Sequence, residues 1–454
     1  MCKGILMKFY IAILTVLMPA VAFGAQDCAT MRHVPDGVQT LQDVIKLGLC
    51  RNPQTAAAYA SLRSSHFNKN AGYANYLPSV SASVSANKNF AQSSDTLKKD
   101  YDWHYGASIS ASYLIFDFGK RTADMNQMIA TYRAAGFDYD ETVQNFVYGL
   151  VGAYYELLNA DADVESAESA LKVAQTAKDM ADKKYKAGSV AKADVYKADT
   201  TLASSQLSLE RAKNNREIAK GTLLTKLSFP ADQEIYIADM SSTFGTEAEN
   251  ENIDELIKIA REKRPDLLKA SASKDAAWHK RNAAFLKNLP SISASGSVSW
   301  NDEKLPGVFE PDSNQINGSI GIRASMPLFA GFANLYGLRA AESDYDRAKY
   351  NEQQTSNAAM MDVFTAYQNY KTAQTVLKHT ETLLKSATEN ERVTSGMYKV
   401  GRSNMLDWQT AQSELINAQK QNNAAKYDLF VKRAAVALAI GDIKSEIEGI
   451  KDDK

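Results

Sequence analysis

The residues that most often carry catalysis are sparse and scattered in this chain. Its five histidines lie far apart and never have a metal-binding spacing such as HExxH. The sequence also contains no phosphate-binding glycine loop, no cysteine–histidine arrangement and no nucleophile elbow. We therefore expect no enzymatic activity, no cofactor and no bound metal.

The most distinctive polar residues lie in two similar segments, each with an aspartate a few residues after a glycine. They are YKAGSVAKADV, which starts at Tyr185, and YKVGRSNMLDW, which starts at Tyr398. The aspartates are Asp194 and Asp407. If each opens a helix after a turn, its charge stabilises that helix by about 0.3–1 kcal/mol. That structural role is one interpretation of both residues, and long elements must hold the two turns in place.

The N-terminus predicts export. Lys3 and Lys8 precede an apolar run of 15 residues over 9–23, followed by small residues, which indicates a signal peptide over 1–24. The run is shorter than the roughly 18–20 residues of a membrane-spanning helix, although a retained anchor is the alternative. After cleavage, Cys28 and Cys50 remain, and an oxidising compartment favours a disulfide between them over two separate thiols.

Composition restricts the class of protein further. The 454 residues contain 52 Lys and Arg against 53 Asp and Glu, so charge gives no reason to expect nucleic-acid binding. Only 10 prolines and 23 glycines are present, which excludes collagen-like and low-complexity chains. Proline is absent between Pro78 and Pro230 and after Pro327, so both stretches can form long helices.

The chain repeats itself at a spacing of 212 to 213 residues. Leu77, Pro78 and Ser79 match Leu289, Pro290 and Ser291, and the two aspartate-containing turns match each other at the same spacing. A repeat of this length predicts two structural copies in tandem. We assign residues 25–227 to the first copy, 228–252 to a linker, 253–441 to the second copy and 442–454 to a polar tail.

Each copy contains two runs in which serine alternates with apolar residues, a pattern that predicts strands with one polar and one apolar face. The runs cover residues 79–90, 105–115, 291–298 and 316–324, with polar loops expected over 91–104 and 301–315. Their length suits strands that cross a bilayer, although a soluble half-buried sheet is the alternative. Four strands cannot close a barrel, so membrane-spanning strands must be pooled between chains. Aromatic residues near the expected strand ends either form an interfacial girdle or pack normally; they are Trp103, Tyr105, Tyr113, Trp300 and Phe329.

The remaining sequence predicts helices of two lengths. Long helices are expected over 120–186 and 333–399, and shorter ones over 41–75, 192–226, 253–288 and 405–440. Two short helices laid end to end match one long helix. A heptad seam predicts an antiparallel coiled-coil hairpin; on the long helix it comprises Ala160, Val164, Ala167, Leu171, Ala174, Lys178, Ala181 and Tyr185.

With the tandem repeat, the paired LPS elements and the twin turns, the chain resembles the TolC-like outer-membrane efflux proteins over essentially its whole mature length. The resemblance implies an α+β fold in which three chains pool four strands each into a transmembrane barrel of twelve strands. A periplasmic α-helical coiled-coil barrel continues it and ends in a constricted tip. It also implies a homotrimer in the outer-membrane lipid, a periplasmic adaptor and an inner-membrane pump, either proton-driven or of the ABC type.

By position, the resemblance implies roles for two sets of residues. The periplasmic gate comprises Asp407, Asp194, Tyr398 and Arg402, and the adaptor-docking tips comprise Gly188, Ser189, Val190, Ala191, Gly401 and Ser403. The chain departs from the family pattern in two places. Thr410 replaces a second acidic residue, and the linking arginine is Arg402 where the family has it at the position of Ser403.

We therefore expect an outer-membrane channel-tunnel that serves as the exit duct of a tripartite efflux pump. One alternative is the outer-membrane component of a type I protein secretion system. An alternative from another class is a soluble periplasmic coiled-coil adaptor or scaffold.

Overall fold

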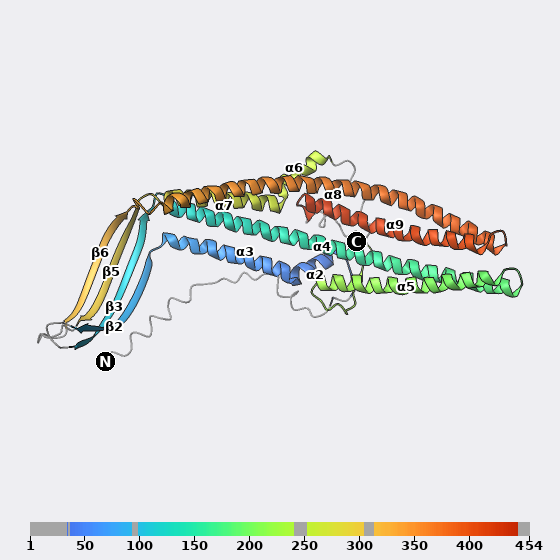
Figure 1. The fold of residues 1–454 in the computed structure, drawn as a ribbon, viewed down its shortest axis with the longest axis horizontal. Coiled ribbons are helices and arrows are strands. Elements are labelled where there is room, and N and C mark those ends of the chain that lie inside the picture. The colour runs from blue at the N-terminus through green and yellow to red at the C-terminus, as the bar shows by residue number, and fades with distance from the viewer. Residues whose placement is uncertain (1–33, 35–36, 93–98, 240–251, 304–312, 444–454) are drawn as a thin grey trace.

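The chain folds into an elongated molecule with a sheet at one end and two helical turns at the other (Figure 1). The computed structural model describes residues 34, 37–92, 99–239, 252–303 and 313–443. The expected signal peptide and Cys28 lie outside the described residues, as does most of the expected polar tail. Cys50 lies half-buried on a helix near the middle of the molecule, and its disulfide stays a prediction.

The sheet contains four antiparallel strands in the order β2-β3-β5-β6. They are β2 (Ser79–Gln92), β3 (Lys99–Phe116), β5 (Ser291–Glu303) and β6 (Ser313–Ser325). The strands predicted from serine alternation are confirmed, but the loops expected over 91–104 and 301–315 are wrong in extent. Backbone pairing continues to Gln92 and Lys99 because the alternation continues there with aromatic and charged residues in place of serine.

The long helices are confirmed as α4 (Lys120–Lys186) and α8 (Ala333–Lys399), each of 67 residues and therefore about 100 Å long. The return helices are α5 (Lys192–Lys226) and α9 (Met405–Ala439). In Figure 1, α3 (Pro53–Gly72) and α5 follow one another along α4, and α7 (Pro265–Leu286) and α9 do the same along α8. None of the described helices has an apolar run long enough to span a bilayer.

The shorter helices expected over 41–75 and 253–288 are each broken by a proline. The first divides into α2 (Leu41–Arg51), α3 and a 3-10 turn η1 (Tyr73–Tyr76), and the second into α6 (Ile253–Lys263) and α7. Asn52 and Arg264 have extended ψ angles of 126° and 123°. A residue before proline is sterically excluded from the helical region, so each helix ends there and proline opens the next one.

The largest hydrophobic core lies at the middle of the long axis, where α2, α4, α5 and the C-terminal part of α9 meet. A two-stranded parallel pair of β1 (Val38–Gln39) and β4 (Tyr236–Ile237) borders it. Tyr154 of α4 is buried there and donates to the Ala238 carbonyl at 2.6 Å. The linker between the two copies is thereby held against the first copy.

The predicted coiled-coil seam is confirmed at its alanines and wrong at its last residue. Ala160, Ala167, Ala174 and Ala181 are buried along α4, whereas Tyr185 is exposed. Tyr185 lies in the last turn of α4, one residue before the helix ends at Lys186. α5 begins only at Lys192, so the coiled-coil packing does not extend to this residue.

Candidate functional site

Both hairpin turns lie at the end of the molecule opposite the sheet (Figure 1). Each closes α4 or α8 with a Schellman motif, in which a glycine takes a left-handed conformation. Gly188 has a φ of +72° and Gly401 a φ of +78°. Their N–H groups donate to the carbonyls of Tyr185 and Tyr398 at 2.9 and 3.1 Å. The expected tip residues of both turns therefore end up exposed or half-exposed on one surface.

Asp194 and Asp407 lie in the first turns of α5 and α9, as the sequence predicts. The Asn404 side chain caps α9 by accepting from the Asp407 N–H at 2.9 Å, and Ser403 Oγ donates to the Asp407 carboxylate at 3.0 Å. α5 has no side-chain cap. The Asp407 carboxylate is exposed, so it can stabilise the helix and still face water.

Tyr398 is the most buried of the expected gate residues, with 2% of its surface exposed. Its ring packs 5.1 Å from that of Trp408, and Lys184 Nζ lies 4.0 Å above its centre. Burial, together with the negative charge of Asp194, raises the pKa of the Tyr398 phenol. Within the described part of the chain, the phenol oxygen is buried without a hydrogen-bond partner.

Lys184 and Trp408 were not predicted, and both help to join the two hairpins. Lys184 Nζ of the first hairpin donates to the Tyr398 carbonyl of the second. Trp408 is buried with Tyr398 against Ala181 and other small residues of the first hairpin. The spacing of Trp408 and its neighbours along one face of α9 was the available sequence signal for this residue. No such periodicity marks Lys184.

Two further hydrogen bonds hold the side chains around Trp408. Its Nε1 donates to Glu391 of α8 at 2.9 Å, which fixes the indole within the second hairpin. Gln409 donates to Thr201 Oγ1 of α5 at 2.6 Å. The second bond is therefore another link between the two hairpins, close to the tips.

The other expected gate residues lie at the same end of the molecule, at the hairpin turns, but their side chains are not bonded to one another in the described chain. Within one chain and among the described residues, no hydrogen bond or ion pair links Asp194, Asp407 and Arg402 to one another. The single chain therefore does not join these side chains into a gate, and their gate roles stay a prediction. Groups of three or more His, Cys, Asp or Glu positioned for a metal ion are likewise absent from the described residues.

The sheet has one face of hydroxyl groups. Register places Ser81, Ser110, Ser297 and Ser319 in a single row across all four strands. Neighbouring hydroxyls along β2 and β3 are 2.8 Å apart in three successive pairs. The Ser297 and Ser319 hydroxyls are 2.9 Å apart. We call this side, with Ser79, Ser81, Ser83, Ser85 and their register partners, the serine face.

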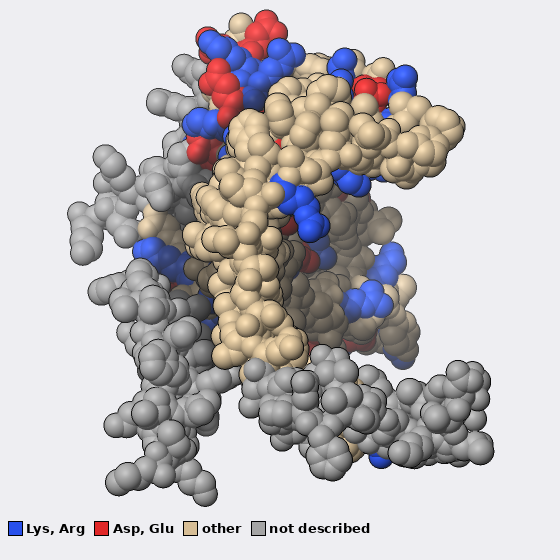
Figure 2. Space-filling model, turned by 90° about the vertical axis from the view of Figure 1, so that its left-hand side faces the viewer, with Lys and Arg blue, Asp and Glu red and all other residues tan. Residues whose placement is uncertain are grey.

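The opposite face is apolar and uncovered in the single chain. Val84 is 87% exposed and Ile320 93% exposed. Trp103 and Tyr105 stack at one end of β3, with ring centres 6.2 Å apart, and Tyr113 lies eight residues further, about 27 Å along an antiparallel strand. This spacing suits the interfacial girdles of a membrane barrel. Figure 2 looks onto the sheet end and shows a largely uncharged surface over the described strands.

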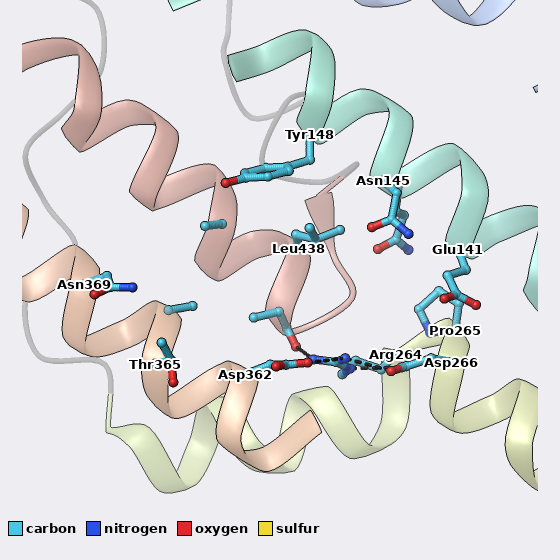
Figure 3. Close-up of a pocket in the computed structure, with 14 residues that line it drawn as sticks. Glu141, Asn145, Tyr148, Arg264, Pro265, Asp266, Asp362, Thr365, Asn369 and Leu438 are labelled. Atoms are coloured by element: carbon cyan, nitrogen blue, oxygen red, sulfur yellow. Dashed lines mark hydrogen bonds and ion pairs between the residues drawn. The ribbon is translucent and has the colours of Figure 1, made fainter. Parts of the chain in front are cut away.

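Arg264 fastens the end of α9 to the break between α6 and α7 (Figure 3). It donates to the Ala439 carbonyl at 3.1 Å, to both Asp266 oxygens at 2.9 and 2.7 Å, and to Asp362 at 3.0 Å. Burial opposes its charge, but the two carboxylates outweigh that effect and raise the pKa of Arg264. These contacts border a pocket at the middle of the molecule and join α6, α7, α8 and α9.

A sheet with one hydroxyl face, one apolar face and two open edge strands, continued by two long hairpins, defines a class of protein. It is a subunit of a pooled β-barrel channel that extends as a helical tunnel. The model of the family described as "Outer membrane efflux protein" matches residues 44–227 and 256–442, which is most of the chain. The chain belongs to this family.

Relatives and solved structures agree with the assignment. Protein CyaE of Bordetella pertussis is 23% identical over 410 residues, which are 90% of this chain and 85% of that protein. Toxin and drug export protein A of Aggregatibacter actinomycetemcomitans is 22% identical over 402 residues, 87% of this chain and 85% of that protein. The outer membrane protein VceC of Vibrio cholerae has the same fold, with a TM-score of 0.76 and 20% identity over 88% of this chain and 96% of VceC.

The predicted class of fold, location and function are therefore confirmed. The fold is the α+β channel-tunnel in which trimeric barrels are built from two tandem copies per subunit. The chain is located in the outer membrane, with its helices in the periplasm, and serves as an exit channel for efflux or secretion. Channels of this family are trimeric and work with pump components. This assignment replaces the alternative of a soluble periplasmic adaptor.

Proposed function

We propose that three copies of this chain form the exit duct of a tripartite efflux pump, without catalysis of their own. A periplasmic adaptor docks on the two hairpin tips of each subunit, and an inner-membrane pump, proton-driven or of the ABC type, supplies the energy. The observation that carries this proposal is the arrangement of the tips. Both turns lie together at the end of the molecule farthest from the sheet (Figure 1), which in an outer-membrane channel is the end that an adaptor and an inner-membrane pump can reach.

The faces of the sheet support the duct. Spanning strands must have every backbone group paired, so the open edges of β2 and β6 require partners from other chains. The serine face can line a wet lumen at no desolvation cost, whereas Ile320 and Val84 gain from contact with lipid. A barrel with serine inside and isoleucine and valine outside satisfies both requirements.

The tips also support a gate. Asp407 is exposed in the first turn of α9, and threefold symmetry would place three copies around a narrow passage. Three carboxylates that face one another favour cations and attract Arg402 or Lys184 from neighbouring elements. Asp194, whose charge acts on the buried phenol of Tyr398, is the second carboxylate of the proposed gate.

Site-specific photo-cross-linking in intact cells tests the docking. A benzophenone amino acid placed at Ser189 or at Arg402 lies on an exposed tip. The matched control is the same amino acid at Lys213, which is exposed halfway along α5. We expect both tip positions to form an adduct with a periplasmic protein anchored in the inner membrane, and Lys213 to form none.

The proposal fails if the tip positions cross-link only to other copies of this chain, or if Lys213 yields the same adduct as the tips. If the expected adduct forms, mass spectrometry identifies the partner. The transporter that co-purifies with this adaptor gives the type of pump.

One observation favours a second candidate, secretion of a protein through the same duct. The relative from Aggregatibacter actinomycetemcomitans carries both toxin and drug export in its name. If the adduct partner co-purifies with an ABC transporter and deletion of this chain abolishes secretion of a polypeptide, the type I secretion alternative replaces efflux.

A further inference from the structure

The serine face has one charged residue between the row of Ser85 and the helical end of the sheet. Register places Arg323 of β6 opposite Ser293 of β5, which itself lies opposite Leu114 of β3. The other register partners in this part of the serine face are Ser, Gly, Asn, Gln and Leu. Arg323 therefore stands alone in an uncharged surface.

Arg323 is exposed and has room to extend. Its neighbours on the same face of β6 are Gly321 and Ser325, and the space beside Gly321 is open. Among the described residues, no hydrogen bond or ion pair engages its guanidinium. The nearby Arg121 differs in this respect, because it donates to the Leu114 carbonyl at 2.7 Å and pairs with Asp117 at 3.3 Å. The charge of Arg323 is thus uncompensated.

The position of Arg323 along the channel follows from the strand. β6 ends two residues later at Ser325, and α8 starts at Ala333. Arg323 therefore lies at the base of the sheet, where the helices begin, and at the opposite end of the molecule from Asp407 (Figure 1).

We propose that Arg323 is a charge-selective residue of the channel, forming a ring of three positive charges at the base of the barrel lumen that favours anionic solutes. This inference rests on the proposed trimeric duct with the serine face inside. Rings of arginine or lysine give pores a preference for anions. Between the row of Ser85 and the helical end of the sheet, the described rows contain no carboxylate that could cancel the ring; Asp102 and Glu303 belong to rows at the far end of this face.

Ionic strength sets the size of the effect. Charges that face an aqueous lumen are screened over about 10 Å at 0.1 M salt and over about 3 Å at 1 M. The ring should therefore influence permeation at 0.1 M and lose most of its influence at 1 M. Three charges at such distances in water change the local concentration of an anion by about two- to threefold.

Reversal potentials of the purified protein in planar lipid bilayers, under a gradient of KCl, test the proposal. In Arg323→Gln the anion-to-cation permeability ratio should fall by about two- to threefold at 0.1 M and remain near the wild-type ratio at 1 M. Arg323→Lys keeps the charge and should keep the ratio. Ser319→Arg adds a charge to the same face and should raise the ratio.

Lys88→Gln is the matched control. Lys88 lies on the same sheet but on the apolar face, with its Nζ 5.6 Å from the centre of the Trp103 ring, and its loss removes the same charge outside the lumen. Its permeability ratio should equal the wild-type ratio.

Three results would overturn the assignment. If Arg323→Gln and Ser319→Arg both conduct with the wild-type ratio, Arg323 does not select ions. If Lys88→Gln shifts the ratio and Arg323→Gln does not, the apolar face lines the lumen. If the wild-type protein inserts but forms no conducting pore even after the tip is truncated, the proposed trimeric duct is wrong. The proposed Arg323 ring, which rests on the duct, is then wrong as well.

Discussion

At the scale of single residues, substitution of Asp407 distinguishes a role in helix stability from a role in gating. Its carboxylate lies exposed in the first turn of α9, so replacing it by asparagine should cost at most about 1 kcal/mol of stability. In the proposed trimeric gate the same change removes three negative charges from the passage. We expect Asp407→Asn to raise single-channel conductance and to lower the cation-to-anion permeability ratio by about two- to threefold in 0.1 M KCl.

Ser403→Ala provides the control for that prediction, because it removes the hydroxyl that donates to Asp407 at 3.0 Å and leaves the charge in place. Its selectivity should match the wild type. Equal conductance and selectivity in Asp407→Asn and wild type would reduce Asp407 to a helix-opening residue. The expected shift is opposite in sign to that of Arg323→Gln, so the two charged positions can be told apart in one set of recordings.

The residues around the two turns show which parts of the candidate site the sequence could predict. The two turns marked Asp194, Tyr398 and Asp407, because each turn repeats a recognisable sequence. Lys184 was missed, since its contact with Tyr398 joins residues 214 positions apart. Such a contact depends on how the two hairpins pack against each other, and neither hairpin encodes that packing alone.

At the scale of elements, the end of α9 depends on Gly441. This residue has a φ of +78°, and a Cβ on it would lie 2.7 Å from the Arg264 Cα and 2.8 Å from the Arg264 nitrogen. Backbone atoms held by the Arg264 ion pairs cannot move away easily. We expect Gly441→Ala to destabilise the protein by roughly 2–4 kcal/mol, as the sum of left-handed strain and steric overlap.

The measurement is thermal loss of the helical circular-dichroism signal, with Gly136→Ala as the control. Gly136 lies within α4, and a Cβ added there would meet no atom within 4 Å, so alanine should stabilise the helix by about 0.5–1 kcal/mol. Equal transition temperatures for the two variants would show that the contact of Gly441 with Arg264 contributes nothing.

Element boundaries were predictable wherever a local signal sets them. Glycine turns and the absence of proline indicated the bounds of α4, α5 and α8, and α9 ends one residue before its expected end. The breaks before Pro53 and Pro265 were missed although both prolines are visible, because the expected helices were drawn through them and the restriction on the preceding residue was not applied. The steric restriction on the preceding residue decides this case.

At the scale of the whole molecule, the described part of the single chain leaves two strand edges without hydrogen-bond partners and one apolar face without cover, and assembly with further chains must supply both. Two edges are open and the apolar face has no cover within the described chain. The sequence predicted this state correctly because an alternating strand has two faces whatever it packs against. Which face meets lipid follows only from closing the sheet with further chains.

Adjacent residues on β6 can decide that orientation directly. Ile320 is on the apolar face and Ser319 on the serine face, so lysine at either position adds the same charge at the same height of the barrel. A lysine that faces lipid near the midplane costs about 2–4 kcal/mol per chain, whereas a lysine in a wet lumen costs little. We therefore expect Ile320→Lys to reduce the amount of trimer in outer-membrane fractions sharply and Ser319→Lys to leave it near the wild-type level. Native mass after detergent extraction measures both. The opposite pattern would place the serines against lipid and invert the barrel, and equal yields would mean that neither face meets the bilayer.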